Sequence, residues 1–274
     1  MKKTLLAAVQ MASGPKVRAN LIEAVRLIER AAAEGSSLVV LPENFAIMGL
    51  EETDKLAVGE AIGSGPIQDF LAEAAAKSRL WLVGGTLPIQ AGNGKVRSTC
   101  LIYDDHGHLA GRYDKIHLFD VNVPGTQERY RESATIEAGT DPLVLDTPFG
   151  RVGVAICYDV RFPELFRHML AGGVDILVIP SAFTAQTGAA HWELLIRTRS
   201  VENLCYTVAA NQGGFHINGR ETYGHSMIVD PWGQILASQP QGSGVVTAEF
   251  DPDRLDKVRM AFPALEHCQL IPGR

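Results

Sequence analysis

The sequence has few cysteines and little net charge. Its 274 residues contain four cysteines, Cys100, Cys157, Cys205 and Cys268, which lie far apart and form no CxxC pair. Disulfide frameworks are typical of small secreted chains, so these residues indicate reduced thiols and a cytoplasmic protein. The net charge of −6 lacks the excess of Lys and Arg that phosphate binding requires. Nucleic acid is therefore not expected as a partner.

Long apolar runs are also absent. None approaches the roughly 20 residues that a membrane span needs, so no membrane partner is expected. Lys2 and Lys3 precede an apolar stretch and resemble the start of a signal peptide. That stretch is broken at Gln10, and no small-residue cleavage site follows, so a first β-strand is the preferred interpretation.

The composition favours one globular unit. Hydrophobic residues make up 46% of the chain and charged residues 20%, which is enough apolar material for one large core. No Ser/Pro-rich linker, charge run or repeat divides the sequence. We therefore expect a single domain over residues 1–274.

Strands alternate with helices in both halves of the sequence. In the first helix, which ends near Gly35, Leu21, Val25, Ile28 and Ala32 recur at spacings of three and four. The pattern predicts further helices at 66–80, 162–173 and 191–204. It predicts strands at 4–10, 36–43, 81–89, 97–104, 151–157, 174–180, 205–211 and 225–230, followed by two more before residue 251. This order indicates an α/β domain with mixed sheets covered by helices.

Glu43 is the first candidate site residue. It follows Pro42 at the end of a buried strand, where a carboxylate beside apolar walls suits proton transfer near neutral pH. The alternative is a helix-capping or surface glutamate.

Lys115 is the second candidate. It lies in GRYDKIHLFD, where Tyr113, His117 and Phe119 give it aromatic neighbours. A lysine there can supply fixed positive charge to a developing oxyanion. The alternative is an ordinary solvated lysine on a strand.

Cys157 carries the strongest local signal. It ends the apolar strand RVGVAIC and is followed by a polar cluster, Asp159, Arg161 and Glu164, that leads into a helix. Helix N-termini and nearby cations stabilise a thiolate nucleophile. The alternative is an inert core cysteine, which is how we interpret Cys205 and Cys100.

Three stretches, LPEN, YDKIHLFD and AICYDVRFPEL, together resemble the motifs of the nitrilase superfamily of carbon–nitrogen hydrolases. The resemblance implies a Glu–Lys–Cys triad of Glu43, Lys115 and Cys157. It also implies a four-layer αββα sandwich, a homodimer or higher homo-oligomer, and no metal or organic cofactor. The segment RESATIEAG further implies that Glu132 is a second glutamate beside the triad. Accordingly, we expect His106 and His108 to be solvated turn residues rather than metal ligands.

The resemblance extends to the Nit-type branch of small amidases. PSAFTAQTGAAHWELL, CYDVRFPEL and YGHSMIVDPWG are more similar to the enzymes of deaminated glutathione than to the omega-amidases of α-ketoglutaramate and α-ketosuccinamate. This implies hydrolysis of a small carboxamide, a metabolite-repair reaction, through a Cys157 thioester with loss of ammonia.

The resemblance also implies substrate-binding residues. The N–H of Tyr158 would stabilise the oxyanion together with Lys115. Phe183 and Thr187 match pocket-lining positions, and Arg161 matches an arginine that meets a substrate carboxylate. For Arg161 a structural ion pair with Asp159 or Glu164 is the alternative.

Two other classes remain to be distinguished from a hydrolase. A dinucleotide-binding oxidoreductase is disfavoured because GSGPIQDF (63–70) lacks the GxGxxG pattern and a preceding strand. A catalytically silent binding protein on the same fold is disfavoured because all three triad positions hold the required residue types.

Overall fold

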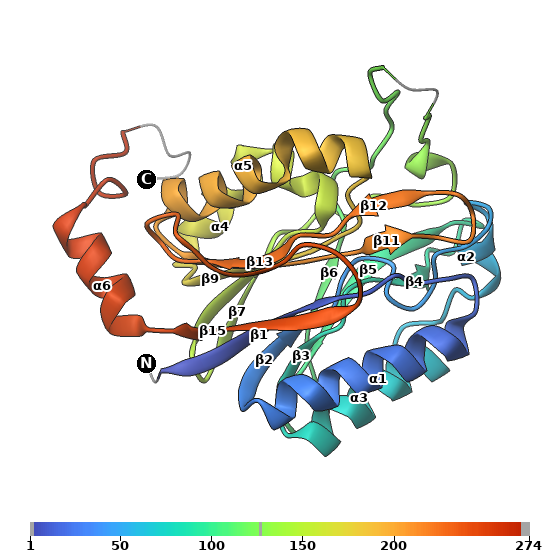
Figure 1. Ribbon diagram of the computed structural model, residues 1–274, viewed down its shortest axis with the longest axis horizontal. Coiled ribbons are helices and arrows are strands. Elements are labelled where there is room, and N and C mark those ends of the chain that lie inside the picture. The colour runs from blue at the N-terminus through green and yellow to red at the C-terminus, as the bar shows by residue number, and fades with distance from the viewer. Residues whose placement is uncertain (1–2, 126–127, 270–274) are drawn as a thin grey trace.

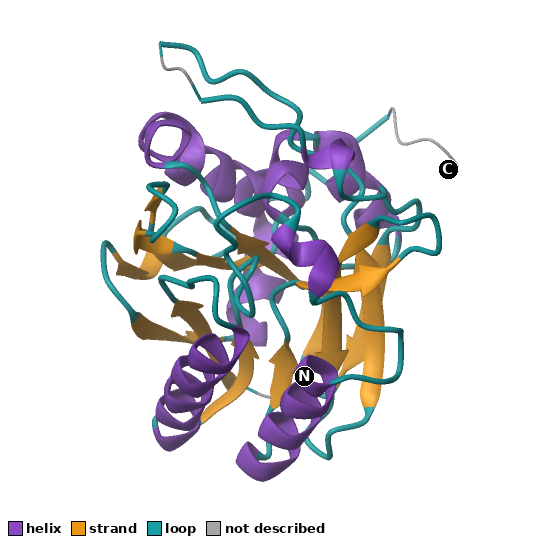
Figure 2. Cartoon of the chain, turned by 90° about the vertical axis from the view of Figure 1, so that its right-hand side faces the viewer, coloured by secondary structure: helices purple, strands orange, loops and turns teal. Residues whose placement is uncertain are grey.

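The computed structural model describes residues 3–125 and 128–269. Two β-sheets lie face to face, and helices cover the outer side of each (Figure 1). Figure 2 shows the same layers edge-on, with strands between two sets of helices. The predicted αββα sandwich is therefore confirmed.

The first sheet has seven strands and is covered by α1 (Val17–Ala33) and α3 (Pro66–Ser78). Strands β1, β2 and β3 are parallel, and the others pair antiparallel. In spatial order the strands are β15 (Gly244–Phe250), β1 (Thr4–Gln10), β2 (Ser36–Val40), β3 (Trp81–Val83), β5 (Val96–Tyr103) and β4 (Leu87–Gln90), with β6 (Leu109–Asp114) also paired to β5.

The second sheet has six strands and is covered by α4 (Pro163–Ala171) and α5 (Ala185–Asn203). Its central strands β8, β9 and β10 are parallel. In spatial order the strands are β14 (Ile235–Gln239), β13 (Ser226–Val229), β10 (Tyr206–Asn211), β9 (Ile176–Ser181), β8 (Gly150–Val154) and β7 (Leu143–Thr147). The remaining elements are the hairpin of β11 (Gly213–Phe215) and β12 (Glu221–Tyr223), α2 (Asp54–Ala57), α6 (Pro252–Ala261) and two 3₁₀ turns, η1 (Glu132–Ala134) and η2 (Cys157–Arg161).

The central strands are apolar on both faces because both faces are buried. On β1, Leu6 and Ala8 belong to a core cluster that includes residues of the second sheet. Ala7 and Val9 point the other way and pack in a second cluster with residues of α1 and α3. This two-sided burial explains why the sequence shows nearly continuous apolar runs at these strands.

The first helix forms where the periodicity predicts it, but its buried face is displaced. Ala24, Leu27, Ile28 and Ala31 are buried, whereas Leu21, Val25 and Ala32 of the predicted stripe are only partly covered. Ala24 and Ala31 are fully buried while the more apolar Leu21 and Val25 are not, so hydropathy alone does not select the buried face. Gly35 has a φ of 91° and ends the helix as predicted.

The strand predicted at 81–89 is interrupted at Gly84–Gly85, which separates β3 from β4. Gly85 has a φ of 55°, and a Cβ there would lie 2.2 Å from the carbonyl oxygen of Pro42. The interruption therefore lets the chain pass directly beside the residue that precedes Glu43.

The helix predicted at 191–204 begins earlier, at Ala185. Thr184 caps it by accepting a hydrogen bond from the N–H of Thr187 at 3.3 Å. His191 therefore lies inside the helix instead of opening it. The sequence did not indicate this start, because Gly188 lies near it and glycine is unfavourable in helices. Gly188 is required by packing, since a Cβ there would lie 2.2 Å from the Cβ of Tyr223.

Several short elements were not predicted: β7, β11, β12, α2 and α6. Each is short or polar on its exposed side, so its apolar periodicity is weak. Over residues 3–125 and 128–269, no helix combines the length and apolar character needed to cross a bilayer.

Replacing Gly85 by alanine tests the close approach at Pro42. Gly85→Ala forces the new Cβ against the Pro42 carbonyl, and we expect a loss of more than about 2 kcal/mol in unfolding free energy, measured by urea denaturation. Gly92→Ala is the matched control, because Gly92 has a φ of 76° but open space around it. Equal losses in the two variants would show that backbone strain alone, and not the contact at Pro42, requires the glycine.

Candidate active site

A cavity of about 310 Å³ lies beside the carboxyl ends of the parallel strands β2, β8 and β9. Both sheets contribute to its wall, as expected for an α/β protein that builds its site at strand ends. Every site residue predicted from the sequence lines this cavity: Glu43, Lys115, Glu132, Cys157, Tyr158, Arg161, Phe183 and Thr187.

Glu43 reaches the cavity from the loop after β2. Its side chain is buried, and its main-chain carbonyl accepts a hydrogen bond of 3.0 Å from Nε2 of Gln212 on the second sheet. The next residue, Asn44, has a φ of 58° and donates its N–H to Oγ1 of Thr86 at 2.8 Å. Glu43 is thus held on a fixed turn, and the capping or surface interpretation is wrong.

Lys115 follows the last residue of β6 and is only 1% exposed. Its Nζ donates to Oε1 of Glu43 at 2.8 Å and to both carboxylate oxygens of Glu132, at 3.0 and 2.9 Å. Burial alone would lower the pKa of Lys115, but attraction to Glu132 and then to Glu43 outweighs it, so this pKa lies well above its usual value. Lys115 is a buried cation, and the solvated-strand interpretation is wrong.

Glu132 occupies η1 and is held from a second side. Its Oε2 accepts the N–H of Phe119 at 2.7 Å as well as the Lys115 ammonium. Glu132 therefore contacts the same ammonium as Glu43, so the predicted second glutamate lies beside two of the three predicted triad residues.

Cys157 does not end a strand as predicted. Strand β8 stops at Val154, and Cys157 opens the 3₁₀ turn η2 with a φ of 48°. Positive φ is rare for a residue with a Cβ and marks a sharp elbow that turns the side chain toward the cavity. The α-helix begins only at Pro163, so η2, and not α4, follows the thiol directly.

Asp159 holds this elbow in place. Its fully buried carboxylate accepts the N–H of Ile156 at 2.8 Å and the hydroxyl of Tyr113 at 2.8 Å. It also accepts the main-chain N–H of His117 at 2.9 Å and lies 2.7 Å from the Nδ1 of that ring. One carboxylate therefore ties the Cys157 turn to the segment that carries Lys115. The sequence showed Asp159 beside the cysteine, but not that Tyr113 of β6 and His117 would bind its carboxylate.

The environment of Cys157 favours the thiol over the thiolate. Burial raises its pKa well above the usual value, and the negative charge of Glu43 raises it further. Lys115 opposes this effect without overcoming it. The expectation that a helix N-terminus and cations would stabilise a resting thiolate is therefore not met. The arrangement instead places a protonated thiol next to a carboxylate that can take its proton.

Aromatic and cationic side chains form the rest of the cavity wall. The Arg161 guanidinium lies 5.3 Å from the ring centre of Phe183 and 5.9 Å from that of Tyr158, and its Nη1 is 3.3 Å from Nδ1 of His191. Within the described chain, Arg161 forms no ion pair with Asp159 or Glu164, so the structural ion-pair alternative is wrong. Its charge faces the cavity.

Arg220 is a cavity residue that sequence reasoning missed. It comes from the loop between β11 and β12, a hairpin that the sequence did not predict. The stretch INGRETY carries no local signal of a binding role, since Arg220 reaches the cavity only because the hairpin folds back over it.

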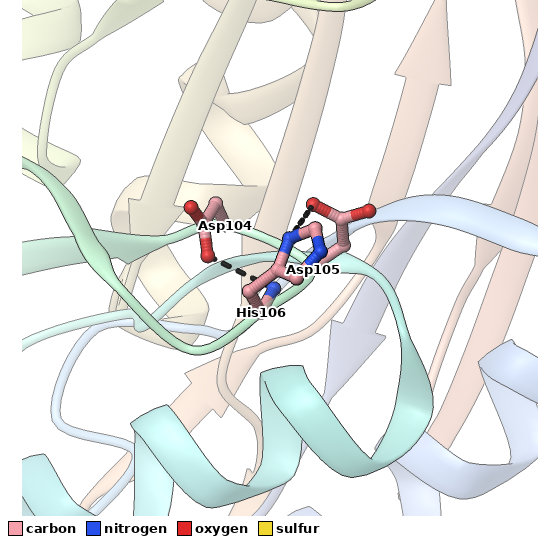
Figure 3. Close-up of side chains that lie close together, drawn as sticks. All are labelled: Asp104, Asp105 and His106. Atoms are coloured by element: carbon pink, nitrogen blue, oxygen red, sulfur yellow. Dashed lines mark hydrogen bonds and ion pairs between the residues drawn. The ribbon is translucent and has the colours of Figure 1, made fainter.

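Within the described residues, one cluster could offer three ligands to a metal: Asp104, Asp105 and His106 (Figure 3). It lies on the exposed turn between β5 and β6 and does not line the cavity. Asp104 Oδ1 already accepts the N–H groups of His106 and His108, at 2.9 and 2.8 Å. These contacts account for Asp104 as the residue that closes the turn.

Comparison with known proteins agrees with the geometry. Residues 5–260 match the family model described as carbon-nitrogen hydrolase. The chain belongs to the carbon–nitrogen hydrolase family. It is 45% identical to a deaminated glutathione amidase of Synechocystis sp. over 97% of this chain and 98% of that protein. It is 37% identical to the deaminated glutathione amidase of Yersinia enterocolitica over 99% of this chain and 95% of that protein. The crystal structure of the C. elegans NitFhit protein matches with a TM-score of 0.90 at 39% identity, over 97% of this chain but 65% of that longer one.

Replacing Glu43 by glutamine tests the electrostatics around the thiol. Because the Glu43 charge raises the pKa of Cys157, Glu43→Gln should shift the pH midpoint of Cys157 alkylation by iodoacetamide to lower pH while amide hydrolysis is lost. The rates are measured by mass spectrometry of the peptide that contains Cys157.

Glu52→Gln is the matched control, because Glu52 also lines the cavity but pairs with Lys55 at 2.7 Å. Its alkylation midpoint should stay at the wild-type value. A midpoint that is unchanged or raised in Glu43→Gln would contradict the proposed placement of charge.

Proposed function

We propose that this chain is an amidase that hydrolyses the amide of deaminated glutathione through a thioester on Cys157. The observation that supports this most directly is the buried contact of Lys115 with Glu43 and Glu132 at the cavity that Cys157 lines. Membership of the carbon–nitrogen hydrolase family and the names of the relatives at 45% and 37% identity point to the same reaction.

The first half-reaction forms the thioester. Glu43 takes the Sγ proton of Cys157, and the sulfur attacks the amide carbonyl carbon. Negative charge develops on the carbonyl oxygen, where the Lys115 ammonium and the N–H of Tyr158 stabilise it. The N–H of Tyr158 is suited to this because the first N–H groups of a helical turn have no partner within that turn. When the tetrahedral intermediate collapses, the C–N bond breaks and Glu43 returns the proton to the leaving nitrogen.

The leaving group depends on the substrate. Deaminated glutathione carries a keto group in place of the amino group of its glutamyl part, and its amides are secondary. Cleavage of its oxoglutaryl amide therefore releases cysteinylglycine. Ammonia was the leaving group expected from the sequence, but ammonia is released only from primary amides such as the ω-amides. In the second half-reaction, Glu43 takes a proton from a water positioned by Glu132, and the water oxygen attacks the thioester carbon. The C–S bond then breaks, Glu43 returns the proton to the sulfur of Cys157, and the keto acid is released.

The remaining wall residues would bind the substrate. Arg161 is suited to a carboxylate because its guanidinium is held over the Phe183 and Tyr158 rings without a carboxylate partner in the described chain. Phe183 and Thr187 line the space beside it.

We further propose that residues 1–274 act as one domain in the cytoplasm and as a homo-oligomer. The site draws Glu43 and Lys115 from one sheet and Cys157 from the other, which supports a single functional unit. The cysteines in the described chain are free thiols, as a reducing compartment maintains them. Exposed apolar side chains near α5 and α6, among them Leu194, Trp232 and Met260, support self-association.

The test is a comparison of kcat/KM for deaminated glutathione, α-ketoglutaramate and α-ketosuccinamate, with the keto acid product measured in each case. We expect the highest value for deaminated glutathione. Cys157→Ala should lower kcat by more than about 10⁴-fold, because the covalent route is removed, whereas Cys205→Ala, at a buried thiol outside the cavity, should retain turnover.

A clear preference for α-ketosuccinamate or α-ketoglutaramate would favour the omega-amidase alternative. Turnover by Cys157→Ala would refute the cysteine mechanism. Binding of the substrate without any turnover by the wild-type protein would indicate a silent binding protein.

A further inference from the structure

Arg220 is fixed on the cavity wall by groups other than carboxylates. Its Nη2 donates to the carbonyl of Ala182 at 3.1 Å, and its main-chain carbonyl accepts the N–H of His216 at 2.9 Å. His216 is in turn held by the carbonyl of Ser13 and by Oγ1 of Thr222, each at 2.8 Å. The loop therefore presents Arg220 to the cavity in a defined position.

The hydrogen-bonding capacity of Arg220 is largely unused. Its Nε is buried and has no acceptor among the described residues. Among the described residues, the one hydrogen-bond acceptor of its Nη1 is the Sδ of Met48, a weak acceptor, at 3.9 Å. In the described chain no carboxylate lies within 4.0 Å of the guanidinium. A guanidinium has five N–H donors and favours a carboxylate that accepts two of them. Arg220 is thus a fixed cation that has no carboxylate at ion-pair distance among the described residues.

A row of aromatic rings connects Arg220 to Arg161. The Arg220 guanidinium lies 5.0 Å from the ring centre of Tyr130, and Arg161 lies 5.9 Å from that of Tyr158. Phe119 stands between the two tyrosines, with its ring centre 5.1 Å from each. All five side chains line the cavity. The wall therefore consists of an apolar row with a guanidinium at each end.

Three of the acids that line the cavity pair with lysines. Lys115 binds Glu43 and Glu132, and Lys55 binds Glu52 at 2.7 Å. Glu52 also attracts Arg220, and Glu51 and Glu128 line the same cavity. Among the described residues, however, no carboxylate forms an ion pair with either arginine, so both guanidinium groups can bind a carboxylate from solution.

We propose that Arg220 binds a substrate carboxylate distinct from the one that Arg161 binds. The cavity would then select amides that carry one carboxylate on each side of the scissile bond. This rests on the proposed function, because the scissile bond is placed by attack from Cys157. Deaminated glutathione carries a carboxylate at each end, whereas a primary ω-amide such as α-ketoglutaramate has only one.

A positioning role is the competing explanation. The backbone of Ala182 lowers the pKa of Cys157, and Arg220 donates a hydrogen bond to the carbonyl of the same residue. Loss of Arg220 could therefore disturb the nucleophile. A binding measurement in a Cys157→Ala background separates the two explanations, because no reaction at sulfur contributes to it.

The probe is N-succinylglycine, a secondary amide with a carboxylate at each end, titrated by calorimetry into Cys157→Ala protein. Adding Arg220→Gln should weaken binding about tenfold to a hundredfold, as expected for a lost charged hydrogen bond. N-butyrylglycine and N-ethylsuccinamate each keep only one of the two carboxylates. The compound that lacks the carboxylate bound by Arg220 should bind Cys157→Ala protein with the same affinity whether or not Arg220→Gln is added. The other compound should bind with the same affinity whether or not Arg161→Gln is added.

Equal weakening of all three compounds by Arg220→Gln, or no weakening of any, would overturn the proposal. Arg220→Lys keeps a positive charge at this position, so its affinity for N-succinylglycine should be intermediate. This variant tests the proposal if the Arg220→Gln protein does not fold. A protein that binds N-succinylglycine through Arg220 but leaves deaminated glutathione intact would contradict the proposed function and not the carboxylate site.

Discussion

The site depends on one buried cation, the ammonium of Lys115, held between Glu43 and Glu132. A charge removed from water is penalised by several kcal/mol unless hydrogen-bonded partners compensate it, and loss of one partner from a buried pair costs about 3–5 kcal/mol. Each member of this cluster therefore requires the others. The cluster also explains why three segments far apart in the sequence, from a strand end, a loop and a 3₁₀ turn, converge on one cavity.

The charge of the cluster has a chemical consequence. With a neutral thiol, two carboxylates and one ammonium give a net charge of about −1, which keeps the proton on Cys157. Transfer of that proton to Glu43 moves the negative charge to sulfur without changing the total. The buried site thus avoids creating new charge when the nucleophile forms, and the Lys115 ammonium remains beside the developing anion. The elbow at Cys157, held by Asp159, fixes the sulfur relative to both groups.

The sequence predicted the layered fold and the triad positions because their signals are local and ordered. Long apolar strands and the three motifs each lie within a few consecutive residues. What it missed depends on contacts between distant segments. The break at Gly85 is required by Pro42, and the start of α5 was hidden by Gly188, which is required by Tyr223. Arg220 reaches the cavity through a hairpin too short to show periodicity. The state of the Cys157 thiol follows from burial and the Glu43 charge, which no neighbour in sequence reveals.

Trapping of the covalent intermediate tests the central claim that Cys157 carries the acyl group. Acid quenching during turnover of deaminated glutathione, followed by trypsin digestion and mass spectrometry, examines the peptide of residues 152–161, which contains Cys157. The account predicts that this peptide gains the mass of the 2-oxoglutaryl group and loses it when treated with hydroxylamine. An acyl group on any other residue, or turnover without an adduct under conditions where hydrolysis of the thioester limits the rate, would contradict it.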